Sequence, residues 1–238
     1  MKGYVKFNWI PNRINIKKIT VRKTIKEYFE KHLAGLFEMV IREYDELPIN
    51  YNENSFTGYL AQAAYNAGGY AIIDYSDLSD DGKSYRPDLY LSINMKGKHW
   101  CDVVMEVKKD EISVRSHRDT IRKRISDNLK KAHKQLRRHR KAKESTYWCS
   151  LAILYVKPSR WKQIAQKKSF NEALSKVRNI VSQVCNDKGG RENMRPNFYF
   201  QYFLNRDKHD KLFSPNEGDE RPDFLGCFVV GILEPCRN

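Results

Sequence analysis

Apolar side chains recur at intervals of three and four residues along four stretches of the chain, which is the spacing of one face of an α-helix. These stretches are residues 20–46, 53–67, 113–142 and 169–185. The second stretch ends at Gly68-Gly69, a pair typical of the C-terminal end of a helix. The pattern therefore predicts four amphipathic helices.

Shorter apolar runs, rich in β-branched and aromatic residues, predict the strands of a sheet. They lie at residues 70–75, 88–94, 99–109, 147–156, 197–204 and 224–233. The run at 147–156 is continuously apolar, as in a strand that is buried on both faces. This order of elements predicts an α/β or α+β fold in which helices flank a mixed central sheet. We expect one domain over 1–238, in which residues 1–50 could form a helical N-terminal lobe beside a core at 51–238.

The composition of the chain is that of a globular protein with a heavily solvated surface. Hydrophobic residues make up 40% of the 238 residues and charged residues 31%, so a real core can form and global disorder is not expected. The five cysteines are scattered, with no CxxC pair for zinc or redox chemistry. Neither a signal peptide nor a long apolar span is visible. We therefore expect a cytoplasmic protein that is not inserted in a membrane.

Positive charge is concentrated in one segment rather than spread along the chain. Residues 115–143 contain 13 Lys or Arg and two acids, so they carry +11 of the formal net charge of +15. A concentrated basic strip is typical of proteins that bind nucleic-acid phosphates. A solvated helix face, an acidic protein partner or an anionic membrane would also account for it.

The predicted hairpin at 88–109 carries a group of residues suited to hydrolysis. Glu106 and Lys108 point to one face of their strand because side chains alternate, and the paired strand can bring Asp88 alongside. Two neighbouring carboxylates repel each other, and a divalent cation such as Mg²⁺ removes that repulsion while using the hard oxygen ligands that it prefers. The ammonium group of Lys108 would orient a water or offset charge in the transition state.

Pro87-Asp88, followed after 17 residues by Glu106-Val107-Lys108 in a hydrophobic strand, resembles the PD-(D/E)XK nuclease superfamily. The resemblance covers roughly residues 50–156 and implies a restriction-endonuclease-like core. It implies that Asp88, Glu106 and the Val107 carbonyl hold Mg²⁺, with Mn²⁺ as a substitute, and that Lys108 assists the attacking water. It also implies products with a 5′-phosphate and a 3′-hydroxyl. A second Arg-Pro-Asp, at 221–223, has no acid and lysine on one strand face after it.

Two helices flanking the motif could add residues to the site. Many family members have an acid on the preceding helix, and Glu53 matches it on the side of Phe56 and Leu60, although in the first turn it could merely complement the helix dipole. On the following helix Gln135 matches a glutamine of some members, or it marks an ordinary boundary between core and solvent. The same helix is expected to contact the phosphate backbone through basic side chains. We assign this role to Arg124, Lys131, Lys134 and Arg138.

The function expected from the resemblance is a metal-dependent endonuclease that cuts DNA, in preference to RNA. The resemblance also suggests phage defence or a mobile element as its setting. A homodimer or a partner protein could supply specificity. The alternative is a basic nucleic-acid-binding module with the same fold and no cleavage activity, and a further one is an interaction protein that binds an acidic partner. Asp102 lies too far along its strand to join the site, and no motif of an ATPase or serine hydrolase is present. The aromatics of NFYFQYF could stack on bases, but such residues in a strand more often form the core.

Overall fold

The computed structural model describes most of the chain, and every structural statement below concerns these residues. They are residues 3–13, 16, 18–44, 53–74, 77–78, 84–95, 100–137, 146–158, 167–187, 194–205 and 224–236.

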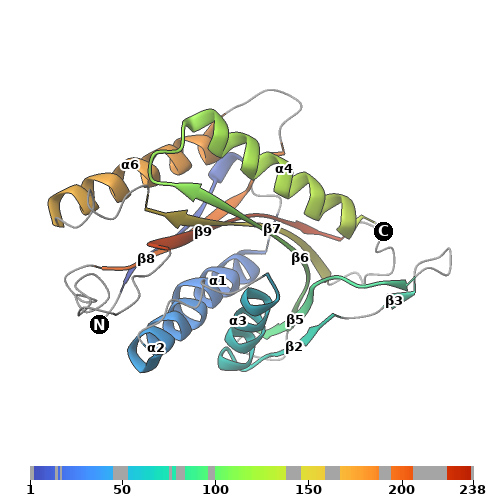
Figure 1. Ribbon diagram of the computed structural model, residues 1–238. Coiled ribbons are helices and arrows are strands. Elements are labelled where there is room, and N and C mark those ends of the chain that lie inside the picture. Colours follow the sequence, from blue (N-terminus) through green and yellow to red (C-terminus); the bar gives the residue numbers. More distant parts are fainter. Residues whose placement is uncertain are drawn as a thin grey trace.

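Seven of the described strands form one mixed sheet, in the order β1-β8-β9-β7-β6-β5-β2 (Figure 1). Only the central pair, β6 and β7, is parallel, and the other neighbours are antiparallel. The strands are β1 (Tyr4–Trp9), β2 (Tyr70–Ile73), β5 (Leu89–Asn94), β6 (Trp100–Ser113), β7 (Thr146–Lys157), β8 (Phe198–Phe203) and β9 (Gly226–Pro235). A separate two-stranded ribbon joins β3 (Asp77–Leu78) to β4 (Ser84–Tyr85).

Helices cover both faces of the sheet, which confirms the predicted mixed sheet flanked by helices. On one face lie α1 (Ile19–Glu27), a π-helical segment η2 (Tyr28–Leu33), α2 (Ala34–Tyr44) and α3 (Glu53–Asn66). On the other face lie α4 (Arg118–Leu136) and α6 (Lys167–Asn186) (Figure 1). A short 3-10 turn, η1 (Pro11–Arg13), follows β1.

The central strands are buried as their sequences predict. All residues of β7 except Trp148 and Lys157 are buried, in keeping with its continuous apolar run. β8 is buried along its whole length, so the aromatic residues of NFYFQYF belong to the core. Their rings pack with Phe7 and Phe29 from the N-terminal part of the chain. The described part of residues 1–50 therefore contributes both a strand and core side chains to the common sheet.

Three differences from the predicted elements concern β1, β6 and α4. β1 was not predicted, because its burial is irregular and its edge position depends on pairing with the distant β8. β6 continues to Ser113, past the predicted end at 109, because β7 pairs with it in parallel as far as Lys157. Consequently α4 begins at Arg118 rather than at 113, and the residues after Arg137 in the predicted 113–142 helix lie outside the described part.

Gly68 and Gly69 end α3 as predicted and bring β2 against β5. Gly68 has a φ of +73°, and its N–H and that of Gly69 bond to carbonyls of the last helical turn. A β-carbon at Gly69 would lie 2.2 Å from the Ser92 carbonyl oxygen, so only glycine allows this close approach. The C-terminal end of α3 is thereby fixed beside the last residues of β5.

None of the described helices has the length and hydrophobicity needed to span a membrane.

The packing of the cysteines gives a direct test of this fold. Four of the five thiols are buried and only Cys236 is partly exposed. Burial raises the pKa of Cys101 and of Cys185 to about 12. Because the thiolate is the reactive form, we expect the native protein to react with iodoacetamide at Cys236 first, and at all five cysteines only after unfolding. Mass spectrometry of the modified peptides measures this, and rapid native labelling at Cys149 or Cys227 would contradict the packing.

Candidate active site

The pairing of β5 with β6 places Asp88 beside Glu106. Leu89 pairs with Met105, so the next position along both strands sets Asp88 opposite Glu106. The Asp88 carboxylate lies against β6, where its Oδ2 accepts a hydrogen bond of 2.7 Å from the Val107 amide. The N–H and C=O groups of one strand residue point to the same side, so the Val107 carbonyl is also directed toward Asp88.

Lys108 joins the two carboxylates. Its Nζ donates a hydrogen bond of 2.8 Å to Oε1 of Glu106 and lies 3.8 Å from Oδ2 of Asp88. We call Asp88, Glu106 and Lys108 the charged trio. The structure therefore brings together the three side chains that the sequence analysis placed at the centre of the site.

The burial of the charged trio is graded from the core toward solvent. The Glu106 side chain is 1% exposed, that of Lys108 18% and that of Asp88 25%. With both acids ionised, the trio carries one net negative charge around a single ammonium group. A buried carboxylate is costly unless it is paired, and here two carboxylates lie on either side of one ammonium group. The trio is therefore suited to binding a further cation from the open side at Asp88.

The oxygen donors of the trio fit a hard divalent cation. Mg²⁺ commonly takes one or two protein carboxylates and keeps several waters, and Asp88 and Glu106 supply such a pair. Among the described residues no group of three or more His, Cys, Asp or Glu side chains is placed to hold a metal ion. The candidate ligand set is therefore smaller, two carboxylates and the Val107 carbonyl, and water would supply the other ligands.

Glu53 is the first residue of α3, and its side chain lies outside the described part of the structure. Phe56 and Leu60 of the same helix are buried, as the helical pattern predicts. Phe56 packs 6.3 Å from the ring of Tyr155, over which Lys109 places its ammonium group. The start of α3 therefore lies beside the part of β6 that carries the trio, but on the opposite face of the sheet.

Asp110 fixes α4 above the site, a role that the sequence analysis did not assign. It shares the strand face of Glu106 and Lys108 and pairs with Arg124 at 2.8 Å and with Asn128 at 3.1 Å. In the sequence, the alternation of an acid, a lysine and an acid at 106, 108 and 110 is the pattern that could have pointed to Asp110. Because Arg124 is engaged with Asp110, its guanidinium is partly committed to holding the helix.

Gln135 and Lys131 continue the edge of α4 that begins with Arg124 and Asn128. The helix runs back along β6, so moving from Asn128 toward its C-terminus corresponds to moving from Asp110 toward Glu106. Along the helix, Lys131 lies roughly 5 Å and Gln135 roughly 10 Å beyond Asn128. Along the strand, Lys108 lies roughly 7 Å and Glu106 roughly 13 Å before Asp110. We therefore expect Lys131 and Gln135 to lie nearest the trio among the residues of this edge.

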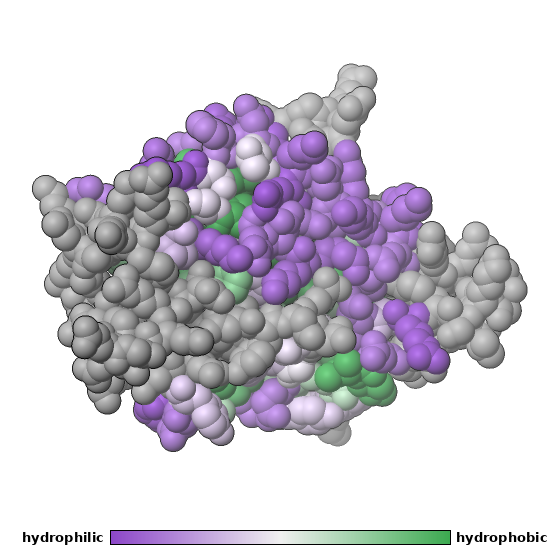
Figure 2. Space-filling view, in the orientation of Figure 1, coloured by the Kyte–Doolittle hydropathy of each residue, from purple (hydrophilic) through white to green (hydrophobic). Residues whose placement is uncertain are grey.

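The outer surface of α4 is strongly hydrophilic (Figure 2). Lys131 and Lys134 are exposed there, and Gln135 is half-buried. Arg138, the fourth predicted phosphate contact, lies outside the described residues.

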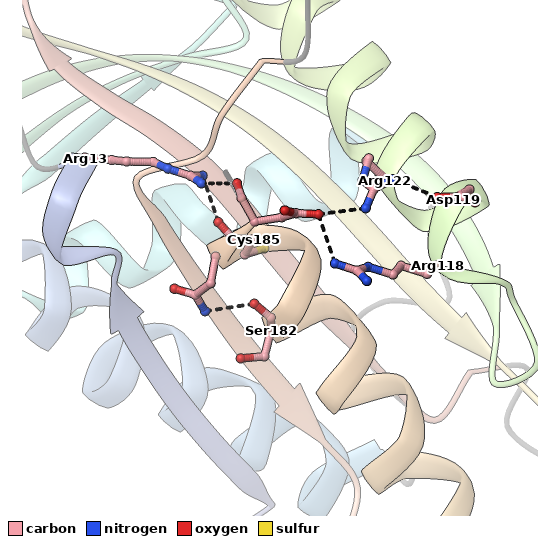
Figure 3. Close-up of polar contacts among 8 residues, drawn as sticks. Arg13, Arg118, Asp119, Arg122, Ser182 and Cys185 are labelled. Carbon is pink, nitrogen blue, oxygen red and sulfur yellow. Dashed lines mark hydrogen bonds and ion pairs between the residues drawn. The ribbon is translucent and has the colours of Figure 1, made fainter. Parts of the chain in front are cut away.

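Other arginines of the basic segment hold α4 against the end of α6 (Figure 3). Arg118 and Arg122 contact the same carboxylate oxygen of Asp187, at 2.9 and 2.7 Å. Arg13 approaches the same turn from the other side and donates to the carbonyl oxygens of Cys185 and Asp187. Part of the positive charge of 115–143 therefore has a structural role, which charge counting alone could not separate from a binding role.

Compared with models of known protein families, with curated proteins and with solved structures, the chain matches none. The function is therefore inferred from the geometry of the site itself.

Proposed function

We propose that the protein is a divalent-metal-dependent nuclease of the PD-(D/E)XK type, acting on DNA in preference to RNA. The observation that carries the proposal is the position of Lys108 Nζ, 2.8 Å from Glu106 and 3.8 Å from Asp88. A structural ion pair needs one acid for one lysine. A lysine beside two acids of the same site is suited to chemistry at a phosphodiester bound through a cation.

The two acids and the lysine of the trio have different tasks in this mechanism. Asp88 and Glu106 would hold Mg²⁺ or Mn²⁺ together with the Val107 carbonyl, and the ion would polarise the phosphodiester and lower the pKa of a bound water. Asp88 is kept in place by the Val107 amide, and Glu106 by Lys108. The Lys108 ammonium group, next to both acids, would orient the attacking water and offset negative charge in the transition state.

The finer fold, a restriction-endonuclease-like core, is part of the same proposal. It is supported by the chain order of α3, the β5–β6 hairpin and α4, with α3 and α4 packed on opposite faces of the strands that carry the trio. Gln135 of α4 and Glu53 of α3 are proposed as further site residues, and Lys131 and Lys134 as contacts to phosphates. The same resemblance suggests a role in phage defence or in a mobile element, and a homodimer or partner protein as the source of specificity.

Dependence on a divalent metal tests the proposal. We expect the purified protein to cut at least one of plasmid, single-stranded DNA and RNA with Mg²⁺ or Mn²⁺, to lose this activity in a chelator, and to regain it when excess metal is added. The new ends should carry a 5′-phosphate, which end-labelling by a polynucleotide kinase measures before and after phosphatase treatment.

Two results would contradict the nuclease proposal. One is cleavage that persists unchanged in the chelator. The other is the absence of cleavage on all three substrates. If the protein in that case binds nucleic acid with an affinity that falls steeply with salt, the non-catalytic module is favoured.

A further inference from the structure

The sheet face that carries the trio remains partly open beyond α4. Side chains of paired strand residues point to the same face, so Tyr70, Tyr90 and Trp100 lie on the face of Glu106. The other face of β5 and β6 is buried through Leu91 and Val103. On the open face, by contrast, Tyr70 and Trp100 are each 44% exposed. Figure 2 shows a small hydrophobic patch low in the view, in the region where β2 and β5 lie in Figure 1.

The three rings form one group across three strands, which we call the aromatic platform. The Tyr70 ring lies 6.2 Å from that of Tyr90 and 5.9 Å from that of Trp100, with interplanar angles of 35° and 52°. Asp102 holds Tyr90 in place, because its carboxylate accepts a hydrogen bond from the Tyr90 hydroxyl. The same carboxylate accepts a hydrogen bond of 2.6 Å from Ser92. Burial and these contacts with Asp102 and Tyr70 raise the pKa of Tyr90, so its hydroxyl stays protonated.

The aromatic platform is continuous with the charged trio. Tyr90 is two residues from Asp88 on the same strand and face, roughly 7 Å along the strand. Trp100 is six residues from Glu106, roughly 20 Å along β6. A stacked nucleic-acid strand advances roughly 3.4 Å per nucleotide, so the platform corresponds to the few nucleotides next to a phosphate held at the trio.

The chemistry of the platform selects bases rather than phosphates. Beside the trio, the side chains that β2, β5 and the Trp100–Val104 part of β6 direct to this face are Tyr70, Ile72, Tyr90, Ser92, Asn94, Trp100, Asp102 and Val104. None of these eight described residues is a Lys or Arg. Exposed aromatic rings stack on the faces of bases, which a duplex keeps covered and a single strand leaves free. The exposed lysines of α4, Lys131 and Lys134, supply the positive charge for the backbone of the same strand.

We propose that the aromatic platform stacks unpaired bases, so that the preferred substrate is single-stranded nucleic acid or a single-stranded segment next to the cleaved bond. This inference rests on the proposed nuclease function for the position of the cleaved phosphate. The stacking itself does not depend on cleavage.

Binding without metal tests the platform separately from catalysis. In a chelator, the affinity for fluorescent oligo(dT) of 12 nucleotides and for a 12-base-pair duplex is measured by anisotropy. We expect Tyr70→Ala and Trp100→Ala each to weaken oligo(dT) binding about tenfold and the double variant about a hundredfold, with duplex binding unchanged. Trp100→Phe keeps a ring and should retain most of the affinity. The matched control is Tyr44→Ala, which removes an exposed aromatic side chain from α2 on the other side of the sheet.

The outcomes separate the platform from the nuclease proposal. A folded double variant that binds oligo(dT) as tightly as the wild type overturns the platform, even if cleavage is metal-dependent. A double variant that changes from dimer to monomer in sedimentation, with oligo(dT) binding intact, also overturns it and assigns the face to self-association. If the wild type never cuts but the ring variants lose oligo(dT) binding as predicted, the platform stands and the nuclease proposal fails.

Discussion

Replacing Glu106 by glutamine is expected to lower the rate of phosphodiester cleavage by a factor of about a thousand or more. The substitution keeps the shape of the side chain but removes one of two negative charges that would hold the cation. Metal ions contribute several kcal/mol to transition-state stabilisation, and each ~1.4 kcal/mol is a factor of ten in rate. Initial rates of plasmid or oligonucleotide cleavage at saturating Mg²⁺ measure the loss.

Glu111→Gln is the matched control for this substitution. Glu111 lies on the same strand, five residues later, but its side chain is 42% exposed and pairs with Lys157 at the surface. We expect this variant to keep the wild-type rate. Thermal unfolding followed by circular dichroism shows whether each variant is folded. A folded Glu106→Gln variant with wild-type activity would remove Glu106 from the mechanism.

Replacing Lys108 by methionine is expected to abolish most cleavage while strengthening metal binding. The loss of the ammonium group removes the stabilisation of the transition state, which for a single preorganised donor is about a hundredfold to a thousandfold in rate. It also removes a positive charge beside both carboxylates and changes the trio from one net negative charge to two. At an effective dielectric near 20, the repulsion between the ammonium group and a cation ~4 Å away is on the order of 4 kcal/mol for each unit of the cation's charge. A gain in Mn²⁺ affinity of at least tenfold is therefore expected, as measured by calorimetry.

The opposite signs of these two effects distinguish Lys108 from a lysine that only holds the fold. If Lys108 only held the fold, its replacement would lower activity and metal affinity together, because less protein would be folded. Lys26→Met serves as the control, because Lys26 is an exposed residue of α1 that pairs with Glu30 by surface contact. Weaker Mn²⁺ binding by a folded Lys108→Met variant would contradict the assigned role.

The centre of the site could be predicted from the sequence because it depends on local geometry. Alternation along one strand puts Glu106 and Lys108 on the same face whatever the rest of the chain does. The short connection between β5 and β6 makes their antiparallel pairing the expected one, and this pairing brings Asp88 alongside. The bond from the Val107 amide to Asp88 follows from the exact register of the strands, which turn lengths alone do not determine.

Features that depend on distant segments could not be predicted in the same way. The Asp110 contacts to Arg124 and Asn128 require the position of α4 on the sheet, so Arg124 was assigned only to phosphate binding. Similarly, Asp187 draws Arg118 and Arg122 from the basic strip because α6 ends beside α4. The aromatic platform joins Tyr70, Tyr90 and Trp100 from three strands, and no pattern within one strand identifies it.

The binding of a cation by Asp88 and Glu106 is tested most directly by anomalous diffraction from crystals soaked in Mn²⁺. We expect a peak at about 2.1 Å from a carboxylate oxygen of each residue, the distance typical of small divalent cations. Crystals of the Asp88→Asn, Glu106→Gln double variant should show no such peak. Crystals in which Mn²⁺ binds elsewhere, while these two carboxylates contact only Lys108 and the Val107 amide, would contradict it.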